Sequence, residues 1–263
     1  MATTGRRILI SGLACGVMLS FCAVPAATAA EWEWSITPYF WAASLQNDVD
    51  VNDDPVIAND VSFDELLDKL DFAGQVHFEG QRGEVGFFAD FEFYDFSDDQ
   101  DYSGGQFPAA VSTESELEQW IIEVGGLWNP SGEVTGFTLL GGARIISVDQ
   151  DIAFEVGAPV NASGETGFDN TLVDVMLGGR YQHGFDNGWT LGFRGDVSTG
   201  DTDLTWNAVG NVGYSFGTEN RYTVLAGYRH MVIDLDDEDG PNGGTIDAEM
   251  IFTGPFVAFR FGF

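Results

Sequence analysis

The sequence predicts an all-β protein, a single up-and-down antiparallel β-barrel that crosses a membrane with strands instead of helices. Three observations lead to this prediction: an alternating C-terminal strand, a secretory leader at the N-terminus, and ten alternating segments in total. An alternating strand alone would not decide the class, because a buried edge strand of a soluble sandwich also alternates. Together the observations indicate an apolar outer wall around a polar interior.

The C-terminal ten residues, 254–263, have two contrasting faces. The apolar face carries Val257, Phe259, Phe261 and Phe263. The opposite face carries Ala258, Arg260 and Gly262. An apolar face opposite an arginine fits a strand between lipid and a polar interior. We expect Phe259, Phe261 and Phe263 to form the C-terminal signal through which the barrel-assembly machinery recognises the chain.

Residues 1–30 have the features of a secretory signal peptide. Arg6 and Arg7 form a basic start, residues 8–24 are apolar, and residues 25–30 offer small side chains for cleavage. Both cysteines, Cys15 and Cys22, lie in this segment, which leaves residues 31–263 free of thiols in an oxidising periplasm. After residue 30 there is no apolar run of about 18 residues, so a helical span is not expected. The predicted organisation is a leader, 1–30, followed by one barrel domain, 31–263.

The composition excludes some classes of protein. The formal charge is −32, and loss of Arg6 and Arg7 with the leader would lower it to −34. Such a chain will not bind nucleic acid electrostatically. High net charge is typical of disorder, but a hydrophobic content of 44% with 14% aromatic residues argues for a folded domain.

Ten segments alternate in the manner of membrane-spanning strands. They are 32–45, 72–81, 84–96, 118–128, 134–148, 171–183, 188–198, 204–216, 221–235 and 247–263. Short connections alternate with longer ones, which we expect at 46–71, 97–117, 149–170 and 236–246. Outer-membrane barrels have short periplasmic turns and long extracellular loops. Only the short connection 199–203 departs from this pattern, so eight or twelve strands are the alternatives.

The charged residues within these segments fall on one face, which we assign to the lumen. The inward acids are Glu79, Asp90, Glu92, Glu123, Asp174 and Asp196. The inward bases are Arg144, Arg180, Arg194, Arg229 and Arg260. Six acids and five bases nearly cancel, which predicts a paired network inside a narrow barrel. Barrels of about eight to ten strands are filled by side chains, whereas open channels need about 16–18, so we expect no large pore.

The first long connection contains a helix signal. Ser62 and Glu65 have the spacing of a capping box, with Ser62 as the N-cap. Phe63, Leu66, Leu67 and Leu70 then form an apolar stripe. We expect a short helix in the first extracellular loop, packed on the barrel mouth; a gate or a partner-docking helix is the alternative.

Two acidic loops and one histidine cluster could have a metal-binding or catalytic role. Residues 234–240 resemble a calcium loop but lack glycine at the sixth position, and 46–60 is acidic in the same way. We interpret both as solvated loops, with divalent cations bridging them to lipopolysaccharide as a weak role. His77 with Glu79 and Asp90 could be catalytic, but a satisfied lumen histidine is the simpler interpretation. We therefore expect no enzyme activity, no catalytic residue, no resident metal and no cofactor.

The chain also resembles a known group of proteins. The segments that carry the resemblance are 36–43, 61–72, 87–90, 194–196, 203–206 and 227–229, which read ITPYFWAA, VSFDELLDKLDF, FFAD, RGD, DLTW and GYR. They are similar to a family of proteobacterial outer-membrane proteins, broadly akin to small OmpA-like and OmpW-like barrels. The resemblance spans nearly all of 31–263 and implies a fold and an outer-membrane location in a Gram-negative cell. It implies no particular activity.

These observations predict a monomeric outer-membrane barrel with a charge-paired, largely closed lumen and acidic extracellular loops. Its role would be structural or in surface interaction, with lipid and lipopolysaccharide as partners. A narrow, porin-like channel for small or cationic solutes is the alternative, because acidic outer loops would draw cations in. An outer-membrane hydrolase is the remote alternative.

Overall fold

The computed structural model describes residues 31–51, 54–104, 107–133, 135–158, 161–239 and 245–263, and the predicted leader lies outside them. Within these ranges the chain forms strands, one α-helix and one short 3-10 turn, η1 (Thr218–Asn220). The first elements are β1 (Glu33–Trp41), β2 (Ser44–Val51), β3 (Asp54–Val61), α1 (Phe63–Lys69), β4 (Leu70–Arg82) and β5 (Val85–Gly104). The remaining strands are β6 (Phe107–Trp128), β7 (Gly136–Val156), β8 (Ala162–Gly184), β9 (Trp189–Gly200), β10 (Leu204–Phe216), β11 (Tyr222–Asp239) and β12 (Thr245–Gly262).

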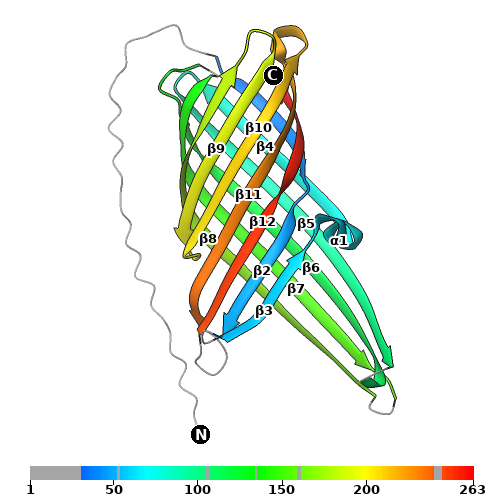
Figure 1. The fold of residues 1–263 in the computed structure, drawn as a ribbon. Helices are drawn as coiled ribbons and strands as arrows, with labels where there is room; N and C mark the ends of the chain where they lie inside the picture. Colours follow the sequence, from blue (N-terminus) through cyan, green and yellow to red (C-terminus); the bar gives the residue numbers. More distant parts are fainter. Residues whose placement is uncertain (1–30, 52–53, 105–106, 134, 159–160, 240–244) are drawn as a thin grey trace. The chain divides into compact units, whose positions relative to one another are not determined.

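Within the described residues, ten strands close into an antiparallel barrel (Figure 1). β4 to β12 pair in chain order, and β1 closes the ring by pairing with β4 on one side and β12 on the other. β2 continues the line of β1 along the outer half of β12, where Ser44 pairs with Thr253 and Val51 with Ile246. The predicted ten-strand, up-and-down barrel is therefore confirmed, with the first predicted strand divided between β1 and β2.

Short turns gather at one rim together with both ends of the barrel domain. β4 and β5 are joined by Gly83 and Glu84, and Gly83 has a φ of 57°, which favours glycine. At the same rim Trp34 and Phe263 exchange two backbone hydrogen bonds, 3.1 and 2.9 Å long. In an outer-membrane barrel this is the periplasmic rim.

The opposite rim differs from the prediction. The segments 97–117 and 149–170, which we expected to be loops, are largely strand, because β5, β6, β7 and β8 are 20, 22, 21 and 23 residues long. A tilted spanning strand needs only about 9–11 residues. The surplus forms a four-stranded extension, β5–β8, that projects beyond the other strands (Figure 1). Similarly, 46–71 folds as the β2–β3 hairpin followed by α1, and β11 and β12 continue into 236–246.

The outer wall of the barrel is apolar, as the alternation predicts. Val175, Phe193 and Val257 are 73%, 54% and 57% exposed, whereas inward Arg144 and Glu123 are 0% and 2% exposed. Charges inside and large apolar groups outside are the reverse of a water-soluble barrel, so this wall faces lipid. No helix in the described part of the chain is long and apolar enough to cross a membrane.

The apolar wall ends at one row of the extension. Phe93 and Trp120 are cross-strand partners on the outer face. Two residues further along, the same face carries a row of four carboxylates on neighbouring strands, Asp95, Glu118, Asp149 and Asp169. This acid row marks the outer surface of the membrane, because carboxylates without partners do not lie in hydrocarbon.

Candidate functional site in the barrel lumen

The most deeply buried charges in the described residues form an ion-pair layer across the middle of the lumen. Arg144 donates through Nε and Nη2 to Glu123 Oε1, at 2.9 and 2.7 Å, and through Nη2 to Asp196. Its Nη1 donates to Ser198 Oγ at 3.0 Å. Arg194 donates to the other oxygens of Glu123 and Asp196. Two arginines and two carboxylates from β6, β7 and β9 therefore neutralise one another.

A second arginine–carboxylate pair joins this layer through Asn207. Asn207 donates to Asp196 and accepts from Nε of Arg229, at 3.0 and 2.9 Å. Arg229 also donates to Glu92 at 2.6 Å, and its guanidinium lies 4.2 Å from the ring of Trp41. The layer therefore crosses the lumen from β5 to β11.

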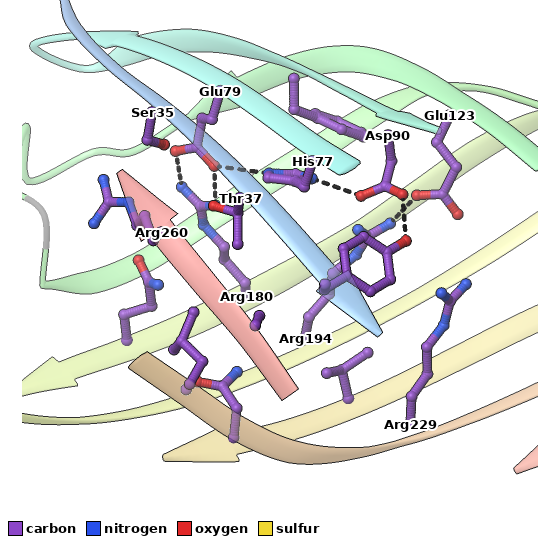
Figure 2. A pocket seen from close by; sticks show the side chains of 18 of the residues that line it. Ser35, Thr37, His77, Glu79, Asp90, Glu123, Arg180, Arg194, Arg229 and Arg260 are labelled. Carbon is purple, nitrogen blue, oxygen red and sulfur yellow. Dashed lines mark hydrogen bonds and ion pairs between the residues drawn. The ribbon is translucent and has the colours of Figure 1, made fainter. Parts of the chain in front are cut away.

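A third group lies on the periplasmic side of this layer (Figure 2). Arg180 binds both carboxylate oxygens of Glu79, and His77 lies between Glu79 and Asp90. The His77 ring nitrogens are 2.8 Å from Asp90 and 3.4 Å from Glu79, and Tyr39 donates to Asp90 at 2.6 Å. Both ring nitrogens of His77 therefore contact carboxylates.

Two of the predicted network residues differ from the rest. Asp174 is 1% exposed and accepts hydrogen bonds from Ser198, Thr202 Oγ1 and the Thr202 amide instead of an arginine. Arg260 lines the lumen near the periplasmic rim, and no ion pair joins it to another described residue. In Figure 2 no dashed line joins Arg260 to another side chain.

An apolar layer fills the lumen on the extracellular side of the charges. Its buried members are Trp41, Ile121, Ile146, Met231 and Ile233. Met250, Phe252 and Phe256 pack against them. Sequence reasoning missed this layer because it assigned a polar interior to the whole barrel. The available signal was the run of adjacent apolar residues at 120–122, 145–146 and 231–233, where both faces of a strand are apolar.

The periplasmic half of the lumen contains a cavity of about 220 Å³. Its wall includes Glu33, Gln81 and Arg260 near the rim, and Glu123 and Trp41 at its inner end. Within the described residues no group of three or more histidine or acidic side chains is placed to hold a metal ion.

Comparison with solved structures agrees with this fold. The chain is similar to the outer membrane protease OmpT from Escherichia coli, with a TM-score of 0.52, 9% identity, and coverage of 91% of this chain and 99% of that one. It is also similar to the translocator domain of the autotransporter NalP from Neisseria meningitidis, with a TM-score of 0.43, 13% identity, and coverage of 90% and 89%. Neither a protein-family model nor a curated protein sequence matches the chain.

The closed barrel and its lipid-facing wall define an outer-membrane β-barrel protein of the bacterial type, and the similarity to OmpT agrees with this fold. At such low identity the similarities concern the fold alone. The activity of any one neighbour is therefore not transferred to this chain.

Proposed function

We propose that this protein is a monomeric, non-enzymatic outer-membrane barrel that does not conduct solutes and that acts through its extracellular surface. One observation carries the proposal: an apolar layer of side chains fills the lumen between the extracellular rim and the inner end of the periplasmic cavity, which is lined by residues of the ion-pair layer. Within the ion-pair layer, Arg144 is 0% exposed.

The surface that would act is the four-stranded extension, β5–β8. Its outer face begins with the acid row at the membrane surface, where the phosphates of lipopolysaccharide lie. We propose that divalent cations there reduce the repulsion between the two sets of anions, as a mobile counter-ion layer instead of a coordinated site. The C-terminal phenylalanines, Phe259, Phe261 and Phe263, would serve assembly, as proposed from the sequence.

Conductance in a planar bilayer tests the closed lumen. Folding is first checked by heat-modifiable gel mobility, and a general porin in the same membranes serves as the positive control. The expected result is a silent membrane at an amount of folded barrel at which the porin gives regular steps. Steady single-channel steps would overturn the proposal and would favour the narrow channel, whose cation selectivity would then be measured.

A further inference from the structure

The strand register gives Arg260 neutral neighbours. Thr223 of β11 pairs with it directly. On the β1 side, the flanking pairs Ile36–Phe261 and Tyr39–Ala258 place Thr37 beside it. Directly opposed residues have Cβ atoms about 4.5–5.5 Å apart, so the inward side chains closest to Arg260 on both neighbouring strands are threonines. A threonine hydroxyl does not neutralise a guanidinium.

Arg144 shows the opposite arrangement. Its cross-strand neighbours are two acids, Glu123 on β6 and Asp174 on β8. Each of the other inward arginines binds at least one described carboxylate, namely Arg144, Arg180, Arg194 and Arg229. Within the described part of the chain, Arg260 is therefore the inward arginine that the ion-pair network leaves without a carboxylate.

The acids on the same side of the lumen are engaged with other partners. Both carboxylate oxygens of Glu79 are bound by Arg180. Asp90 contacts His77 at 2.8 Å and also accepts a hydrogen bond from a tyrosine hydroxyl. An arginine in the lumen wall whose nearby carboxylates are already bonded favours an anion from outside the chain.

Arg260 lines the periplasmic cavity, where space for such an anion exists (Figure 2). Glu33 belongs to the same wall and is exposed at the periplasmic end of β1, so the cavity opens on the periplasmic side. Four residues of strand, or about 13 Å, separate Glu33 from Thr37, so this carboxylate lies well away from Arg260. Further hydrogen-bonding side chains of the wall are neutral: Ser35, Gln182 and Asn211.

The opposite wall of the cavity is apolar. Phe88, Leu127 and Leu140, from β5, β6 and β7, line it and belong to one buried apolar cluster. Four strands separate β7 from β12 in each direction around the ring, so Leu140 and Arg260 lie on opposite walls. A ligand that suits both walls has a negative charge at one end and an apolar body at the other.

The volume restricts this ligand to a small molecule. At roughly 10–15 Å³ for each water-sized group, the cavity of about 220 Å³ accommodates about 15–20 such groups. Among anions, a carboxylate matches the planar guanidinium of Arg260, because two parallel N–H···O bonds can form between them.

We propose that the periplasmic cavity binds a small organic carboxylate, with the carboxylate on Arg260 and the apolar body against Phe88, Leu127 and Leu140. The ligand enters and leaves from the periplasm, because the apolar layer fills the lumen beyond the inner end of the cavity. The route of entry rests on the closed lumen of the proposed function, whereas the site itself does not.

Isothermal titration calorimetry of the protein folded in non-ionic detergent micelles tests the site, with benzoate as the probe. Benzyl alcohol, which has the ring without the charge, and inorganic phosphate, which has charge without the ring, are titrated in parallel. The expected result is saturable binding of one benzoate per barrel, at least tenfold tighter than binding of either of the other two. Absence of saturable benzoate binding would overturn the proposal. Equal binding of phosphate would also overturn it, in favour of a site for inorganic anions.

Matched variants separate the site from binding to the micelle. Arg260→Gln should weaken benzoate binding at least tenfold, whereas Arg221→Gln should leave it unchanged, because Arg221 is 55% exposed and pairs with Glu219 outside the cavity wall. Ala258→Leu reduces the cavity volume and should weaken binding without a change of charge. Wild-type affinity in an Arg260→Gln barrel that folds by gel mobility would contradict the proposal. If that variant does not fold, wild-type affinity in Ala258→Leu would contradict it.

Discussion

Acidic residues have opposite surroundings in the ion-pair layer and in the extension: arginines surround them in the first, and other acids face them in the second. In the lumen, Glu123 lies between two arginines and is 2% exposed. On the outer face of the extension, Glu118 lies opposite Asp95 on one side and Asp149 on the other, with no basic partner among the described residues. Directly opposed residues have Cβ atoms about 4.5–5.5 Å apart, so like charges there repel. Acids therefore stabilise the fold in one region and destabilise it in the other.

This difference shows that net charge and stability are separate properties in this molecule. The charges that hold the barrel together nearly cancel, whereas most of the net charge of −32 lies where it faces water. A large net charge favours solubility and repels other acidic surfaces. We therefore expect that removing charges lowers the free energy of unfolding in the ion-pair layer and raises it in the acid row of the extension.

The largest effect is expected for Arg144→Ala. It leaves Glu123 and Asp196 buried, with Arg194 as the only arginine still bonded to them in the described structure. Loss of one partner from a buried ion pair costs about 3–5 kcal/mol, and the free energy of unfolding should fall by this amount. Denaturant unfolding in detergent micelles measures it.

Arg180→Ala is the matched control, because the Arg180 side chain is 16% exposed and binds one carboxylate, Glu79. The free energy of unfolding should fall less for Arg180→Ala than for Arg144→Ala. An unchanged unfolding midpoint for Arg144→Ala would show that the ion-pair layer does not stabilise the barrel.

A smaller effect of opposite sign is expected for Asp149→Asn. The change removes a charge that faces Glu118 and Asp169, and should raise the free energy of unfolding by about 0.2–1 kcal/mol. Calcium at millimolar concentration should raise the thermal midpoint of the wild type more than that of the variant. Asp98→Asn, which removes the partner of Lys69 in the same extension, should not stabilise. Destabilisation by Asp149→Asn would contradict the repulsion described here.

The smallest effect is expected for Lys69→Ala. Lys69, the only lysine in the sequence, pairs with Asp98 at 2.8 Å, but the two side chains are 38% and 31% exposed. Exposed pairs contribute about 0–1 kcal/mol. Unfolding at low salt and at about 1 M salt should show a small difference that disappears as the screening length falls to about 3 Å. A loss as large as that of Arg144→Ala would remove the distinction between the two regions.

The sequence predicts the barrel well because the alternation of apolar and polar residues indicates which face of each strand contacts lipid. The predicted strand ends are wrong where this alternation changes. Beyond Phe93 and Trp120 the outer face becomes acidic, so the apolar alternation that defines a spanning strand is lost while the chain continues as strand. Glu114, Glu116 and Glu118 still alternate with less polar residues, and this period of two was the signal for the extension.

The members of the ion-pair layer could be predicted, but their partners could not. Alternation places Glu92 and Arg229 in the lumen, yet they are 137 residues apart in sequence, and Glu79 and Arg180 are 101 apart. Which charges meet depends on how the strands are staggered around the closed ring. Tyr39 and Asn207, which complete the network, carry no charge that would mark them in advance.

The ion pair between Glu92 of β5 and Arg229 of β11 has a consequence for biogenesis. Glu92 and Arg229 lie on strands that are far apart in an open sheet and meet only when β1 joins β12. Until that moment each would enter the bilayer as an uncompensated charge, which is costly. Ring closure and charge neutralisation are therefore a single cooperative step, and a half-inserted sheet of this protein has no low-energy resting state in the membrane.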